Sequence, residues 1–184
     1  MNDTAADDVT PATTVTPARG WRRPAVLIPA ILVLLGLVVA AALAFQPWRL
    51  VLDQTVEEAI PAAAVAPTTI LSGQFISHEH DTQGTARVLE TADGQRILRL
   101  EGLRTSNGPD LKVWLSDAPV LPGTEGWFVF DDGEYVDLGA LKGNVGNQNY
   151  AIPADVDLTD LSSVTIWCDR FNVSFGAAEL RPQP

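Results

Sequence analysis

The chain has 184 residues, a formal net charge of −11 at pH 7, one cysteine and two histidines. Residues 50–184 hold 20 acidic and eight basic residues, and so acidic a domain argues against nucleic acid and anionic lipid surfaces as partners. One cysteine excludes an internal disulfide, so the domain must be stable through its hydrophobic core.

The N-terminal residues 1–24 form the first segment. They are rich in Thr, Ala and Asp, include Pro11 and Pro17, and have almost no apolar side chains before Trp21. Such a composition cannot bury enough surface to fold. We expect a disordered tail here, on the cytoplasmic side of a membrane.

Residues 25–45 form an apolar stretch without any charged side chain. As a helix, 21 residues extend about 31 Å, which matches a hydrocarbon core of about 30 Å. Inside lipid every backbone amide must be satisfied within the segment, so a helix is the expected form. The sequence predicts one transmembrane helix over residues 25–45, with the lipid bilayer as its partner.

The arginines around this stretch predict its orientation. Arg19, Arg22 and Arg23 precede it, whereas only Arg49 follows it closely. Because the side richer in Arg and Lys stays cytoplasmic, we expect a single-pass protein of the cell membrane with residues 49–184 extracytoplasmic. The alternative is a signal peptide cleaved after Ala44, but the apolar run is longer than the hydrophobic region of a signal peptide, which has roughly 7–15 residues. Both interpretations place the domain outside.

Residues 46–69 connect the apolar stretch to the domain. The apolar residues between Trp48 and Ile60 fit a short helix at the outer membrane face. The Pro- and Ala-rich residues 61–69 fit a spacer. We therefore expect a juxtamembrane segment followed by a linker.

From Ile70 onward the sequence changes to short runs of β-branched and aromatic residues separated by turn signals. Asp93-Gly94, between runs at 85–91 and 95–103, is a hairpin signal. Further strands are expected at 111–116, 134–141, 149–152, 163–168 and 171–180. Seven to nine short strands at this spacing predict an all-β domain over residues 70–184, an antiparallel β-sandwich or a barrel.

Three segments of this domain together resemble a known family. They are Gly73-Gln74-Phe75 with His80 and Gly84, the run SNGPDLKVWLS at 106–116, and residues 164–176 around Cys168. In this order they resemble the electron-transfer DM-thirteen (DM13) domain family over about residues 70–182. The resemblance implies a β-sandwich whose cysteine takes part in redox chemistry. The domain is also similar to β-sandwich domains that bind haem or sugars, and the composition, poor in Lys, indicates a bacterial source.

Cys168 is the candidate catalytic residue, as a redox thiol. It could cycle through a sulfenate or a mixed disulfide, or ligate a metal or haem; thiol reactivity requires a lowered pKa and exposure. The alternative is structural, because Val164, Ile166 and Cys168 continue one apolar face and free cysteine is among the most buried residue types. From sequence both interpretations stay open.

The histidines and tryptophans are the candidate cofactor-binding residues. His78 and His80, two apart, would project from one face of a strand and could bind a transition metal if Cys168 completed the site; the alternative is a solvated loop. His80 matches the family pattern. Three tryptophans, Trp114, Trp127 and Trp167, could line a cofactor slot or relay electrons, or only pack. The cofactor is unknown, with haem or a transition metal as the options.

The sequence has no Ser-His-Asp order, paired-carboxylate motif, phosphate loop or CxxC motif. Hydrolase and transferase functions have no support, and whether the domain is an enzyme stays open. Our first hypothesis is a membrane-anchored extracytoplasmic redox domain centred on Cys168, with an unidentified redox or protein partner. The alternative is a non-catalytic binding or adhesion module. A third option, a structural accessory subunit of a membrane complex, is compatible with the anchor.

Overall fold

The computed structural model describes residues 24–45, 52–61 and 66–183. The chain divides into two compact units, Met1–Gln46 and Pro47–Pro184. The described part of the first unit is helix α1, Pro24–Phe45, and its side chains from 27 to 40 are exposed. Among the described residues, no helix combines the length and the apolarity that a membrane crossing needs. The expected tail over 1–23, residues 46–51 and the spacer residues 62–65 lie outside the described part.

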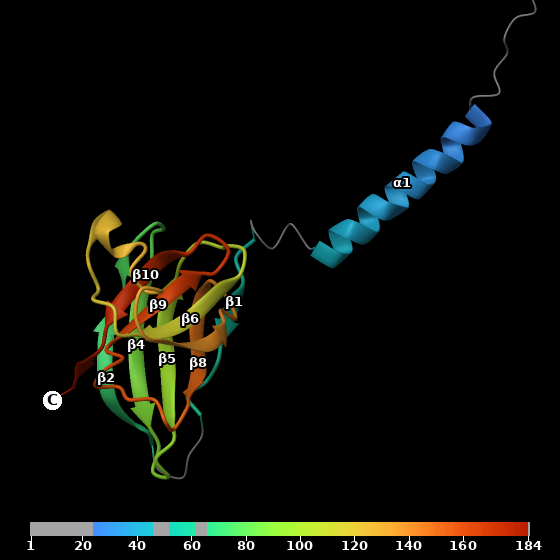
Figure 1. Ribbon diagram of the computed structural model, residues 1–184. Coiled ribbons are helices and arrows are strands. Elements are labelled where there is room, and N and C mark those ends of the chain that lie inside the picture. The colour runs from blue at the N-terminus through green and yellow to red at the C-terminus, as the bar shows by residue number, and fades with distance from the viewer. Residues whose placement is uncertain (1–23, 46–51, 62–65, 184) are drawn as a thin grey trace, which may run out of the picture. The chain divides into compact units, whose positions relative to one another are not determined.

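The second unit is a sandwich of two β-sheets (Figure 1). The six-stranded sheet contains, in spatial order, β1 (Thr55–Glu57), β8 (Val145–Ile152), β5 (Arg96–Arg104), β4 (Gln83–Glu90), β2 (Thr68–Gln74) and β11 (Arg181–Pro182). The five-stranded sheet contains β3 (Ile76–Ser77), β10 (Val173–Glu179), β9 (Ser163–Cys168), β6 (Leu111–Ser116) and β7 (Tyr135–Ala140). All pairs are antiparallel except β1 with β8. The predicted antiparallel β-sandwich is therefore confirmed.

The main core lies between the two sheets. Side chains alternate across a strand, so every second residue of β6 and β9 faces the six-stranded sheet, where Val88, Leu98 and Leu100 are fully buried. In β10 a bulge between Ser174 and Gly176 shifts the alternation, and Val173, Phe175 and Ala178 face this core. Strands β6, β9 and β10 cross in front of β4, β5 and β8 in Figure 1. This is the core that an acidic domain without disulfides requires.

A second apolar cluster lies on the opposite face of the five-stranded sheet. Its buried members are Trp114, Ala118, Phe130, Trp167 and Ala177. Two of these, Ala118 and Phe130, come from the segment 117–134, which joins β6 to β7 and contains the short helix η2, Gly123–Gly126. This segment covers the outer face, and every residue of β9 is consequently buried.

The expected strands agree closely with the observed ones in the centre of the sheets. The boundaries of β6 and β9 are those that the sequence predicts, and β4 and β5 form the expected hairpin, with Gly94 at φ 79° in its turn. Strand β8 begins at Val145, four residues before the expected start at Asn149. It pairs along its length with β5, which extends it.

The segment before the domain differs from the prediction. The helix expected within residues 48–60 is wrong for its described part, because Thr55–Glu57 form β1 and pair in parallel with β8. Lys142 Nζ also binds both carboxylate oxygens of Glu58, at 2.8 and 3.0 Å. The division at residue 70, with 46–69 as a separate juxtamembrane segment and linker, is therefore corrected: this strand belongs to the domain. A three-residue strand whose partner lies about 90 residues away leaves no local signal.

Candidate functional site

Cys168 lies at the end of β9 and is fully buried. Its side chain joins the main core with Val164 and Ile166, which confirms the apolar face expected from the sequence. The Sγ–H group donates a hydrogen bond to the carbonyl oxygen of Pro109 at 3.3 Å. The cysteine therefore lies directly beneath the turn that precedes β6.

The surroundings of Cys168 favour the neutral thiol. Burial raises the pKa of the Cys168 thiol, and the carboxylates of Glu79 and Asp110 raise it further, while backbone hydrogen bonds from Phe171 and Arg170 act in the opposite direction. Because the thiolate is the nucleophile, Cys168 is not activated in this conformation.

The turn over Cys168 is tightly packed. Asp110 has a φ of 61°, a left-handed conformation that Asp adopts more readily than most residues. A Cβ atom at Gly108 would lie 2.8 Å from Cζ of Phe175, so only glycine fits there without displacing the ring. The sequence Asn107-Gly108-Pro109-Asp110 thus serves as a close-fitting cover.

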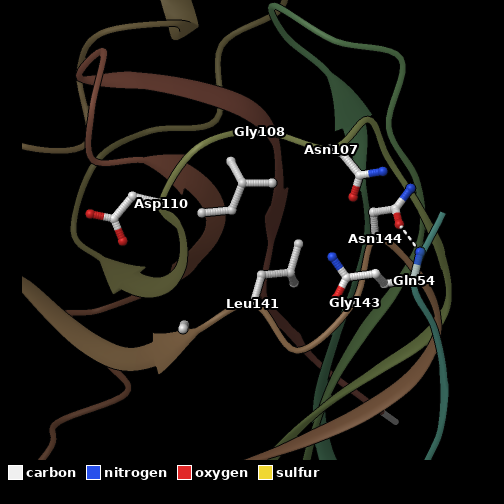
Figure 2. A pocket seen from close by; sticks show the side chains of 9 residues that line it. Gln54, Asn107, Gly108, Asp110, Leu141, Gly143 and Asn144 are labelled. Carbon is white, nitrogen blue, oxygen red and sulfur yellow. Dashed lines mark hydrogen bonds between the residues drawn. The ribbon is translucent and has the colours of Figure 1, made fainter. Parts of the chain in front are cut away.

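A pocket of about 250 Å³ opens beside this turn (Figure 2). Its lining residues are Gln54, Asn107, Gly108, Asp110, Leu111, Ala140, Leu141, Gly143 and Asn144. In Figure 2 the amide side chains of Asn107, Asn144 and Gln54 gather on one side and Asp110 lies on the other. Asn144 Oδ1 accepts a hydrogen bond from the Gln54 backbone amide at 2.7 Å, and its Nδ2 donates to Asp53 and to the Thr105 carbonyl. The pocket is lined by amide groups and one carboxylate, next to the covered cysteine.

His80 lies partly exposed after β3. Its ring packs on Phe175 with the centroids 3.9 Å apart, and its Nε2 lies 3.2 Å from the Glu79 carboxylate. The Phe175 ring in turn lies against Gly108, in the turn that covers Cys168. His80 therefore lies near the same end of the sandwich as Cys168, but its ring contacts Phe175 and not the cysteine.

His78 is buried and fully hydrogen-bonded, which the sequence did not reveal. Its Nε2–H donates to the Leu121 carbonyl at 3.0 Å, and its Nδ1 accepts from the Ser174 hydroxyl at 2.7 Å. Burial lowers the pKa of His78, against the opposing effect of the Leu121 hydrogen bond. The expectation of a solvated loop is wrong for this residue: neutral His78 attaches the covering segment to β10.

Trp167, the third candidate, is fully buried and faces away from Cys168 in the outer cluster. Its ring stacks on Trp114 with the centroids 5.0 Å apart and meets Phe130 edge-on at 6.4 Å. Within the described residues, no hydrogen bond or ring contact joins Cys168, His80 and Trp167 to one another.

A bound metal or haem finds no assembled donor set in the described part of the chain. No group of three or more His, Cys, Asp or Glu side chains is placed to hold a metal ion there. His78 uses both ring nitrogens for protein hydrogen bonds, and Cys168 and Trp167 face opposite sides of one sheet. These side chains do not fit a haem or metal site in this conformation.

Comparison with known families adds one decisive observation. The family model for Electron transfer DM13 matches residues 74–180. The chain belongs to the electron transfer DM13 family. The matched range contains β4 to β10, the cover over Cys168 and the whole segment 117–134, so both the cysteine and the aromatic cluster lie within the DM13 domain. No curated protein and no solved structure matches the chain significantly.

Proposed function

We propose that this chain is an extracytoplasmic electron-transfer module, attached to a membrane by residues 25–45, in which Cys168 is a redox-active thiol. The observation that supports it best is the position of Cys168. The only cysteine of a DM13 domain lies beneath a single turn, with its thiol bonded to the Pro109 carbonyl and a polar pocket beside it. Displacement of one short turn would expose it.

The proposed chemistry begins when the cover formed by residues 107–110 opens. Exposure to water removes the burial that raises the thiol pKa. The thiolate then attacks hydrogen peroxide: an S–O bond forms, the O–O bond breaks, and sulfenic acid and hydroxide result. One small-molecule thiol condenses with the sulfenic acid to a mixed disulfide and water, and a second displaces Cys168 as a thiol. Two electrons thus pass from two thiols to one peroxide.

The test is trapping of the sulfenic acid in the full-length protein. The protein is treated with hydrogen peroxide and dimedone, and adducts are located by mass spectrometry. We expect an adduct at Cys168 that is absent in Cys168→Ser. Gly108→Ala should raise the rate of adduct formation, because the added methyl group collides with the Phe175 ring and displaces the cover.

The alternative, a non-catalytic binding module, is favoured by one specific observation. Cys168 has no exposed surface, and burial raises its pKa. In that case the pocket formed with Asn107 and Asn144 would be the functional feature, and Cys168 would only pack. An absence of any adduct without denaturant, both in the native chain and in Gly108→Ala, would rule out the redox role of Cys168 and favour the binding module.

Attachment to the membrane is supported by sequence alone. Residues 25–45 have no charge, and Arg19, Arg22 and Arg23 precede them. We expect the full-length chain to stay in membranes after alkaline carbonate extraction. Protease added outside intact cells should cleave its domain. The double substitution Leu34→Arg and Leu35→Arg should release the chain from membranes, since each arginine costs about 2.5–3.5 kcal/mol at a helix centre in lipid. Release of the unaltered chain by carbonate would contradict the anchor.

A further inference from the structure

A row of aromatic rings crosses the outer face of the five-stranded sheet. Tyr135 stacks on Trp114 with centroids 4.0 Å apart and planes within 9°, and Trp114 stacks on Trp167 at 5.0 Å and 25°. Phe130 follows, edge-on to Trp167, and the His78 ring lies 5.9 Å from Phe130. The row extends from the edge strand β7 to His78, which follows β3 at the other edge of the sheet.

The strand register produces this row. Trp114 pairs with Asp137 on β7 and with Thr165 on β9, so Tyr135 and Trp167 are its diagonal neighbours. Diagonal neighbours on one face are within reach of aromatic side chains. The stacking is therefore built into the two pairings of β6.

Exposure decreases along the row from the surface inward. Tyr135 is 45% exposed, Trp114 is 4% exposed and Trp167 is fully buried. Only the phenol end of the row meets solvent, because the segment 117–134 contributes Ala118 and Phe130 to the cover over the indoles. One oxidisable ring is thus accessible, and two stacked behind it are shielded.

The indole N–H groups are not used for hydrogen bonding. Nε1 of Trp114 and Nε1 of Trp167 are buried without a hydrogen-bond partner among the described residues, as is Nε1 of Trp127, which lies outside the row. An unsatisfied buried donor is unfavourable and calls for a reason. Phenylalanine rings would pack in an apolar cluster without that cost, but they are far harder to oxidise than indoles. An indole without a proton acceptor also keeps its proton when it loses an electron, so the electron can return without proton transfer.

We propose that Tyr135, Trp114 and Trp167 form a path for single electrons, with Tyr135 as the point where a redox partner exchanges them. The proposal rests on the electron-transfer role of the domain and not on Cys168 chemistry. When a high-potential one-electron oxidant takes an electron from buried Trp167 by tunnelling through the covering segment 117–134, Trp114 supplies one to the indole radical cation. Tyr135 then supplies an electron to Trp114 and releases its phenolic proton to water. A reductant that donates a hydrogen atom, such as ascorbate, restores Tyr135 from the phenoxyl radical.

The chain contains an internal control for this path. Its other tyrosine, Tyr150, lies in the six-stranded sheet, where its hydroxyl donates to Gln148 at 2.9 Å. Burial raises the pKa of Tyr150 to about 12. No ring contact joins it to a tryptophan among the described residues. Oxidation of the buried indoles should therefore reach Tyr135 and not Tyr150.

The test is laser photoionisation of tryptophan in the full-length chain with the tryptophans outside the row, Trp21, Trp48 and Trp127, replaced by Phe. A cobalt(III) ammine complex captures the ejected electron and is reduced irreversibly to cobalt(II). We expect the indole radical signal to decay as a phenoxyl signal grows, at a rate independent of protein concentration. This growth should persist in Tyr150→Phe, disappear in Tyr135→Phe, and slow at least tenfold in Trp114→Phe, which keeps a ring in the stack.

Two outcomes would overturn the path: phenoxyl growth that survives in Tyr135→Phe, or growth whose rate rises in proportion to protein concentration. Circular dichroism checks the fold of each variant. Tyr135 is exposed, so Tyr135→Phe should fold normally. The test therefore does not depend on whether Trp114→Phe folds. Cys168→Ser separates the two proposals. It abolishes the sulfenic acid adduct, but it should leave the phenoxyl growth unchanged.

Discussion

The two faces of strand β9 are both buried, but they are built from different side chains. The inner face places Val164, Ile166 and Cys168 in an aliphatic core between the sheets. The outer face places Ser163, Thr165 and Trp167 under a connecting segment, among rings and hydroxyl groups. The inner face needs only complementary shape, whereas the outer face combines apolar packing with fixed polar contacts.

The polar contacts of the outer face form one connected network. Thr165 and Ser174 share a hydrogen bond of 2.7 Å between their hydroxyl groups, and Ser174 continues it to His78. His78 then holds the Leu121 carbonyl of the covering segment. The comparison shows that the same five-stranded sheet stabilises the sandwich on one side and holds an aromatic row in fixed geometry on the other.

The largest expected effect tests whether the outer cluster is a true second core. Trp167→Ala should lower the free energy of unfolding by about 3–5 kcal/mol, and the inner-face change Ile166→Ala by about 2–5 kcal/mol. Chemical denaturation of both variants measures this. The segment 117–134 would be only loosely attached if Trp167→Ala lowered the free energy of unfolding by less than about 1 kcal/mol while Ile166→Ala lowered it by the expected value of about 2–5 kcal/mol.

The next effect concerns His78, which attaches that segment. His78→Ala leaves the Ser174 hydroxyl and the Leu121 carbonyl without their partner, and we expect a loss of about 1–3 kcal/mol in unfolding free energy. The loss should appear together with a red shift of tryptophan emission, because water reaches the outer indoles. A loss of stability with unchanged emission would separate His78 from the aromatic cover.

His78 also makes stability depend on pH. Burial lowers its pKa in the folded state, whereas an unfolded imidazole titrates near 6.5. Below that pH the unfolded chain binds more protons, so the free energy of unfolding should fall as the pH decreases from about 7 to 5. Denaturation midpoints across this range should show the fall in the native chain and in His80→Gln. The midpoints should depend less on pH in His78→Gln. An equal pH dependence in the two variants would contradict the assignment of this effect to His78.

The predictability of the fold follows from how far each interaction extends along the chain. Strands β6 and β9 could be predicted to the residue because their apolar alternation is local. The burial of His78 could not, because it depends on Leu121 and Ser174, which lie 43 and 96 residues away. One feature of the sequence could have indicated that β9 is buried on both faces. Its residues, SVTIWC, include no charged side chain, as is typical of a strand covered on both faces.

The candidate site was predictable to a similar extent. The sequence placed Cys168 on an apolar face, and the structure confirms that placement. It could not indicate that the turn at Pro109 covers the thiol, since that contact spans 59 residues. The separation of Trp167 from Cys168 does follow from the predicted strand, because adjacent residues of a strand point to opposite faces, even though both residues are candidates for one site from the sequence.

A smaller effect is expected at Cys168 itself. Cys168→Ala removes one buried sulfur atom and its hydrogen bond, and we expect a loss of about 1 kcal/mol. If the inner face serves only for packing, this change affects stability alone. If Cys168 is the redox group, it also abolishes the sulfenic acid adduct, whereas the aliphatic control Val164→Ala leaves the adduct in place while it lowers stability.

The smallest effect tests the attachment of β1. The hydrogen bond from Lys142 lowers the pKa of Glu58, so this pair stabilises the folded state above the ordinary glutamate pKa and is lost as the pH falls through the lowered value. Both side chains are partly exposed, so Glu58→Gln should cost about 0.2–1 kcal/mol at neutral pH. Hydrogen exchange of the Glu58 amide, which donates to the Asn147 carbonyl at 2.9 Å, reports the attachment directly. Faster exchange there, with unchanged exchange at Trp167, would show that β1 opens independently of both faces of β9. Equal acceleration at the two positions would instead make β1 part of one cooperative unit with the five-stranded sheet.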